Sequence, residues 1–135
     1  MTDKDFLKMA IDKGNEVDAP YNFGAIVVKN RVVLGSDHAH VTDLHDPSAH
    51  SEVCAMRLAG QKVQNWRLEG CTLYASHEPC TMCLSCAAWA GIERIVFVTP
   101  ASAQNDVMYE FKEPDIFGLA TMLTNPIKIE QCDLS

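Results

Sequence analysis

Two short motifs contain the side chains best suited to bind a metal. The sequence P-C-T-M-C at residues 79–83 offers two thiols three residues apart, and His50 lies 30 residues before Cys80. Catalytic zinc sites commonly take three protein ligands from histidine, cysteine and carboxylate side chains, and they leave a fourth position to water. The sequence therefore predicts one zinc ion per chain, held by His50, Cys80 and Cys83.

A carboxylate stands beside the predicted histidine ligand, because Glu52 follows His50 by two residues. Zinc lowers the pKa of its bound water to about 7, which makes a water nucleophile available at neutral pH. A nearby glutamate can accept the water proton and later donate protons to the reacting groups of a substrate. We therefore predict that Glu52 is the catalytic residue of a hydrolytic site.

A C-x-x-C motif is also found in structural zinc sites and in redox proteins. A closed structural site needs a fourth ligand, and Cys54 and Cys86 are the available candidates. We interpret both as buried thiols that pack as small apolar groups, and we interpret Cys71 and Cys132 in the same way.

The elements that position these motifs follow from apolar periodicity, caps and turns. We predict helices over residues 3–13, 49–58, 80–90 and 115–123, and strands over residues 25–29, 32–35, 72–76, 94–98 and 127–130. Asp3 is the predicted first N-cap, Gly60 the second C-cap, and residues 36–47 a loop. The second and third helices begin at or near His50 and Cys80, where a helix N-terminus favours thiolates.

The order of the elements defines the fold class. Asn30-Arg31 is typical of a hairpin turn, so the first two strands are predicted antiparallel. Strand, helix, strand over residues 72–98 predicts a right-handed crossover between parallel strands. The class is therefore α/β, a mixed sheet of about five strands flanked by helices in two or three layers.

Length and charge limit the organisation and the partners. The chain has 135 residues, 47% of them hydrophobic, which predicts one domain over residues 1–135. It shows no secretory signal and no apolar run long enough to span a membrane, so we expect a cytoplasmic protein with reduced cysteines. The formal charge of −7 argues against a nucleic-acid partner and favours a small, weakly charged ligand.

The motifs H-x-E and P-C-x-x-C together resemble those of the cytidine-deaminase-like superfamily of zinc deaminases. The resemblance extends over residues 22–25, over D-P-S-A-H-S-E at 46–52, and over L-Y-A-S-H-E-P-C-T-M-C at 73–83. It is most similar to the free-base branch. It implies a homodimer that releases ammonia from the exocyclic amino group of guanine, cytosine, isocytosine or a related amino-heterocycle.

The family usually has an asparagine in a G-x-N segment that reads the ring, and this chain has none there. That region contains Asp37, His38 and His40 instead. We therefore expect the edge of the substrate ring that they contact to differ from that of ordinary guanine or cytosine. Flat aromatic side chains and acids near the C-terminus are further candidates. The complete set of predicted substrate-binding residues is Phe23, Asp37, His38, His40, Ser76, Trp89, Asp106 and Glu110.

Two other functions remain open at this point. Transfer-RNA adenosine deaminases share many of the same motif residues. This chain has 11 basic and 18 acidic residues, however, so it has few positive charges with which to bind a polyanion. A non-catalytic, zinc-stabilised binding module is the second alternative. Glu52 argues against it, because a structural site has no use for an unligated carboxylate beside the metal.

Overall fold

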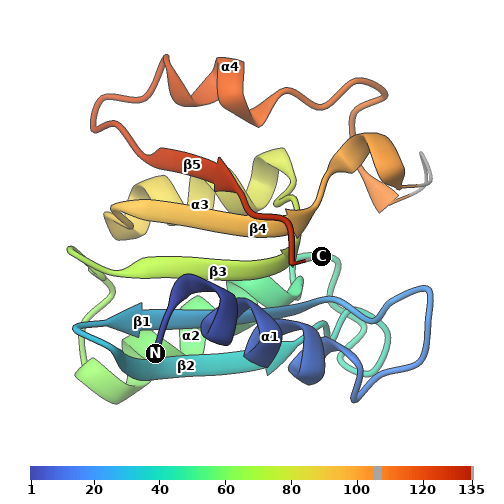
Figure 1. The fold of residues 1–135 in the computed structure, drawn as a ribbon, viewed down its shortest axis with the longest axis horizontal. Helices are drawn as coiled ribbons and strands as arrows, with labels where there is room; N and C mark the ends of the chain where they lie inside the picture. Colours follow the sequence, from blue (N-terminus) through green and yellow to red (C-terminus); the bar gives the residue numbers. More distant parts are fainter. Residues whose placement is uncertain (105–107, 135) are drawn as a thin grey trace.

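A five-stranded mixed sheet forms the centre of the molecule in the computed structural model, which describes residues 1–104 and 108–134. The strand order is β2-β1-β3-β4-β5 (Figure 1). The strands are β1 Gly24–Lys29, β2 Val32–His38, β3 Thr72–His77, β4 Arg94–Thr99 and β5 Lys128–Gln131. The helices are α1 Asp3–Gly14, α2 Ser51–Val63, α3 Thr81–Ala90 and α4 Ile116–Ala120, with a 3-10 turn at Ala101–Ala103.

The sheet separates two apolar clusters, and the strands alternate between them. Ala25 and Val27 of β1 face the larger cluster, which includes α2 and α3 residues, whereas Ile26 and Val28 face the smaller cluster under α1. This period of two is expected for a strand covered on both sides. Figure 1 shows α1 on one face and α2 and α3 on the other, so the architecture has three layers.

The predicted strand directions are confirmed. β1 pairs with β2 and β3 in antiparallel fashion, and β3, β4 and β5 run parallel. Asn30 and Arg31 form the hairpin turn with φ of 50° and 65°. Two successive residues with positive φ are the mark of a turn whose twist matches that of the flanking strands.

Several predicted boundaries are corrected. Thr2, not Asp3, caps α1, because its hydroxyl accepts from the Asp5 N–H and the Asp5 side chain accepts from the Thr2 N–H. Gly60 does not end α2, which continues to Val63 and stops where Gln64 takes a left-handed conformation with φ of 56°.

Two further differences concern segments outside the central strands. The predicted loop at residues 36–47 begins later, because β2 remains paired with β1 as far as His38. α4 is shorter than the predicted 115–123 helix, although Asp115 caps it by accepting from the Gly118 N–H. Neither difference moves the ends of the elements that hold the metal motifs. In the described part of the chain, no helix is long and apolar enough to span a membrane.

Candidate metal centre and substrate pocket

Two helix N-termini bring the predicted metal ligands together. His50 is the N-cap of α2 and Cys80 is the N-cap of α3, and neither side chain forms a hydrogen bond that caps its helix. Cys83 lies in the first turn of α3, one turn beyond Cys80. All three side chains are therefore free to point into the space between the two helix ends, beside the carboxyl end of β3.

The distances within this triad fit a tetrahedral zinc ion. The two sulfurs are 3.6 Å apart, and His50 Nδ1 lies 3.5 Å from Cys80 Sγ and 3.6 Å from Cys83 Sγ. Bonds of about 2.3 Å to sulfur and about 2.0 Å to nitrogen place tetrahedral ligand atoms roughly 3.5 to 3.8 Å apart. The residues present thus fit the metal without rearrangement.

The electrostatics of the triad prepare it for a cation. The hydrogen-bonding contact with Cys83, together with the nearby His50 imidazole, lowers the pKa of Cys80 to about 4. The contact between the His50 ring and the Cys80 sulfur raises the pKa of His50. A lowered pKa at Cys80 favours the thiolate, which is the form of cysteine that binds zinc, and the helix N-termini add to its stabilisation.

The closed, four-ligand alternative is not formed by the described residues. Within ranges 1–104 and 108–134, the ligand group at this position contains His50, Cys80 and Cys83 alone. Cys54 instead lies 3.9 Å from the Arg57 guanidinium, and Cys86 lines a groove on the outer face of α2 and α3. The geometry matches an open site that keeps one position for a non-protein ligand.

Glu52 is buried beside the triad, in the first turn of α2, with 7% of its surface exposed. Ser51 donates a short hydrogen bond to its carboxylate. Burial raises the pKa of Glu52, and the nearby Cys80 thiolate adds to that effect. A carboxyl group with a raised pKa exchanges protons closer to neutral pH, as general acid–base catalysis requires.

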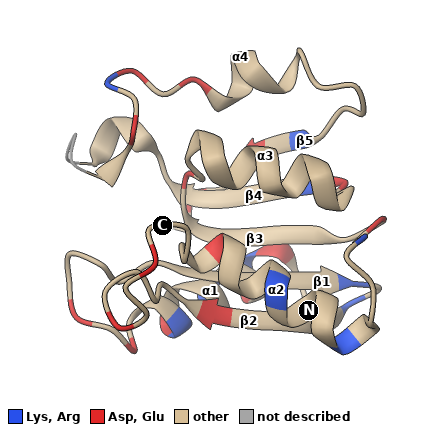
Figure 2. Cartoon of the chain, turned by 180° about the vertical axis from the view of Figure 1, so that it is seen from behind, with Lys and Arg blue, Asp and Glu red and all other residues tan. Residues whose placement is uncertain are grey.

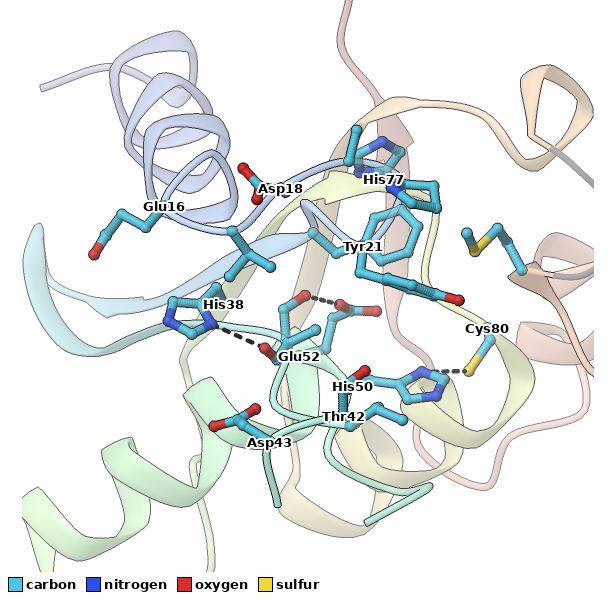
Figure 3. Close-up of a pocket in the computed structure, with 18 of the residues that line it drawn as sticks. Glu16, Asp18, Tyr21, His38, Thr42, Asp43, His50, Glu52, His77 and Cys80 are labelled. Carbon is cyan, nitrogen blue, oxygen red and sulfur yellow. Dashed lines mark hydrogen bonds between the residues drawn. The ribbon is translucent and has the colours of Figure 1, made fainter. Parts of the chain in front are cut away.

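A pocket of about 780 Å³ opens over His50, Glu52 and Cys80 (Figure 3). Its volume falls within the range of sites for small molecules. Most residues of the segments 16–23, 38–43 and 77–80 line its walls, together with Met108 and Tyr109. The Tyr109 hydroxyl donates to the Glu78 carbonyl at 2.7 Å, which ties the far wall to the segment that carries Cys80.

Two of the predicted substrate-binding residues line this pocket. Phe23 and His38 are on its wall, and Phe23 meets the His77 ring edge to face, with ring centroids 4.3 Å apart. Ser76 is buried behind that wall and contacts His77. Asp37 and His40 are not among the described lining residues; they bond to each other at 2.8 Å beside the pocket.

The remaining predicted residues lie elsewhere. Trp89 is 74% exposed and lines the α2–α3 groove, so the structure does not bring it to the pocket. The reason is that α3 turns this side chain away from its buried face. Glu110 is exposed and reaches the site only through its charge, which contributes to the raised pKa of His50. Asp106 lies outside the described residues.

Sequence reasoning missed the role of His77 as a wall of the pocket. Its position at the end of β3, three residues before Cys80, was a usable signal, because the carboxyl ends of parallel strands border ligand sites in α/β folds. The acids Glu16, Asp18 and Asp43 at the pocket were also missed. They come from two loops whose approach depends on the tertiary fold.

The mixed sheet, the His-Cys-Cys triad at two helix ends and the buried glutamate define the class of zinc deaminases. The sequence matches the family described as cytidine and deoxycytidylate deaminase zinc-binding region over residues 1–99. The chain belongs to this family, whose description confirms a zinc-binding deaminase domain. The resemblance predicted from the motifs is thereby confirmed.

Relatives within the family differ in what they act on. The chain is 35% identical to guanine deaminase of Bacillus subtilis (strain 168) over 122 residues, covering 85% of this chain and 78% of that protein. It is 38% identical to the tRNA-specific adenosine deaminase of Aquifex aeolicus (strain VF5) over 90 residues, which are 67% of this chain and 56% of that protein. These two similarities leave the substrate open.

Solved structures agree with this placement. The structure of Bacillus subtilis guanine deaminase superposes with a TM-score of 0.72 at 35% identity, covering 76% of this chain and 67% of that one. A structure from work on tRNA:A34 deaminases gives a TM-score of 0.79 at 22% identity, covering 94% and 91%. The second similarity concerns the fold alone.

Proposed function

We propose that this protein is a zinc-dependent hydrolytic deaminase that releases ammonia from the exocyclic amino group of a free nucleobase or related amino-heterocycle. One zinc ion per chain is held by His50, Cys80 and Cys83. The observation that carries the choice of a free base is the pocket lining, which among the described residues offers five acidic side chains and no lysine or arginine.

Glu52 performs the proton transfers in this proposal. Zinc, when bound, supplies a water nucleophile at neutral pH. Glu52 would accept a proton from the attacking water and give it to the ring nitrogen beside the attacked carbon. It would then take the remaining proton from the hydroxyl added to that carbon and deliver it to the departing amine. The balance is one water consumed and one ammonia released as the C–NH2 group becomes a carbonyl. Ser51 holds the carboxylate in place between these transfers.

The charge of the pocket argues against a polyanionic substrate. Its acidic lining residues are Glu16, Asp18, Asp43, Glu52 and Glu78, and the described lining includes no lysine, arginine, asparagine or glutamine. Figure 2 shows acidic segments on the loops at this end of the sheet.

Two basic side chains beside the pocket are paired with acids that line it. Lys13 pairs with Glu16 at 3.1 Å, and His40 pairs with Asp43 at 2.8 Å, so neither is free to bind a phosphate. Binding of transfer RNA relies on many such free cations. A neutral or positively charged ring is therefore the better match.

A panel of substrates tests the proposal. Ammonia release should be measured from guanine, cytosine, isocytosine and adenine, from their nucleosides, and from transfer RNA, with Glu52→Gln as the inactive control. We expect at least one free base to be deaminated without ribose or phosphate. Turnover of nucleosides or transfer RNA with no turnover of any base would reject the free-base proposal in favour of the editing alternative.

We also propose a homodimer, in line with the resemblance. The support is a groove between α2 and α3 beside which Trp66 and Trp89 are 66% and 74% exposed. Burial of such large side chains stabilises association. Light scattering should give twice the chain mass, and Trp89→Glu should give the monomer while zinc content is unchanged. A monomeric parent would reject the dimer.

A cytoplasmic location stays a prediction.

A further inference from the structure

His77 is the pocket residue that the reaction scheme leaves without a task. It ends β3 on the pocket wall, three residues before Cys80, and burial lowers its pKa to about 4. The ring is therefore neutral across the working pH range. A neutral imidazole has one donor nitrogen and one acceptor nitrogen, so its function depends on which nitrogen carries the proton.

The hydrogen bonds behind the wall fix that choice. The Gly24 N–H donates to Ser76 Oγ at 3.0 Å, so this hydroxyl already accepts one bond. Ser76 Oγ also lies 2.7 Å from His77 Nδ1. Ser76 is 3% exposed, and among the described residues its hydroxyl proton has no other acceptor. Since a buried hydroxyl donates where it can, Ser76 donates to Nδ1, and the His77 proton resides on Nε2.

The other ring nitrogen faces the pocket. Nε2 of His77 has no hydrogen-bond partner among the described residues. In that part of the chain, every fully buried side-chain nitrogen or oxygen has a partner, so Nε2 cannot be fully buried. Nε2 is therefore accessible, and the pocket is the space that His77 borders. The edge-to-face contact with Phe23 holds the ring plane, with an interplanar angle of 83°. Figure 3 draws His77 among the lining residues with Glu52 and His50.

We propose that His77 determines specificity by presenting a fixed Nε2–H donor that reads a hydrogen-bond acceptor of the substrate, a carbonyl oxygen or an unprotonated ring nitrogen. Gly24 and Ser76 position that donor. A ring that offers only N–H or NH2 groups at this edge is rejected, because two donors then face each other without a partner. The inference rests on the proposed deaminase function for its substrate.

The tautomer is tested first, without any substrate. Long-range proton–nitrogen NMR spectra of the zinc-loaded protein should show Nε2 of His77 protonated and Nδ1 unprotonated, unchanged from pH 8 to pH 5. Ser76→Ala should convert this signal to a mixture of tautomers while zinc content stays the same. Protonation of Nδ1 in the parent protein, or titration near the ordinary histidine pKa, would overturn the inference even if deamination is confirmed.

The role in recognition is tested next on whichever free base is turned over. His77→Leu removes the donor, and His77→Gln retains an N–H near the position of Nε2. We expect kcat/KM to fall roughly 10- to 100-fold in the leucine variant and to recover for the most part in the glutamine variant. Far-UV circular dichroism and zinc content of both variants control for folding.

Substrate analogues identify the atom that is read. For cytosine or guanine, a thio analogue weakens the carbonyl acceptor, and a deaza analogue replaces a ring nitrogen by C–H. The parent enzyme should discriminate against one of these analogues, and His77→Leu should lose that discrimination. If every analogue keeps the same relative kcat/KM in parent and variant, His77 reads no acceptor. If no free base is turned over at all, the proposed function fails, whereas the tautomer result stands on its own.

Discussion

Replacement of Gly35 by alanine tests how closely β2 must approach α2 to hold the metal site. An added Cβ at Gly35 would overlap the carbonyl oxygen of Ala55 and lie 2.8 Å from the Ala59 nitrogen. Both are backbone atoms of α2, the helix that begins directly after His50 and contains Glu52 in its first turn. No side-chain rotation can relieve such a clash, so the strand and the helix must move apart.

The size of the effect follows from these distances. An ordinary contact is about 3.4 Å, so the Ala59 nitrogen must retreat by at least about 0.6 Å, and the Ala55 carbonyl by more. Overpacking of this kind typically costs about 1–3 kcal/mol, and a backbone clash belongs at the upper end. A displacement approaching 1 Å at a catalytic group can lower the rate roughly 100-fold. We expect both losses in Gly35→Ala.

Urea unfolding and ammonia release measure these two losses, and competition with a chelator measures zinc affinity. Gly60→Ala is the matched control, because Gly60 lies inside α2 and an added Cβ there meets one carbonyl, that of Asn65, at 3.1 Å. Alanine also favours the helix, so the control should stay within about 1 kcal/mol of the parent. If Gly35→Ala matches the parent within about 0.5 kcal/mol and threefold in rate, the close packing has no role in holding the site.

Two further predictions concern the metal and the stability of the fold. Cys83→Ala should abolish stoichiometric zinc in elemental analysis, whereas Cys86→Ala should retain it; the reverse result would reject the assignment of the ligands. Arg94 donates to Asp3 at 2.6 and 2.9 Å and lowers the pKa of that carboxyl. A carboxyl group whose pKa is lowered in the folded protein stabilises the fold at pH values above the ordinary Asp pKa. This stabilisation is lost as the pH falls through the lowered pKa. Asp3→Asn should therefore reduce the free energy of unfolding by about 1 kcal/mol at pH 7 and by little at pH 2. An equal loss at both pH values in urea unfolding would contradict this reasoning.

The grouping of His50, Cys80 and Cys83 was predictable because local rules place these residues. Cys80 and Cys83 follow a strand and open a helix, and His50 stands where another apolar helix begins. Each motif is confined to a few consecutive residues, so spacing alone determines its geometry. The parallel crossover between β3 and β4 then needs no information beyond the order of the elements.

The pocket walls were less predictable, because they depend on contacts between distant segments. Trp89 was predicted to bind substrate, yet α3 is apolar on nearly all sides and its sequence does not reveal which face is buried. The proposed orientation of His77 depends on Ser76, whose hydroxyl accepts a hydrogen bond from the Gly24 N–H. Gly24 and Ser76 are 52 residues apart in the chain. Gly60 was predicted to end α2, but the helix continues to Val63 and Gln64 adopts the left-handed conformation instead.

The central claim is that zinc at His50, Cys80 and Cys83 works with Glu52 as the proton carrier, and Glu52→Gln tests it most directly. The amide has nearly the same shape but cannot move protons, so zinc content and thermal stability should stay close to those of the parent. Ammonia release from the best free base should fall by about 10⁴-fold or more, because one group serves several proton transfers. A variant that loses its zinc, or that retains its metal and deaminates within about threefold of the parent rate, would contradict the claim.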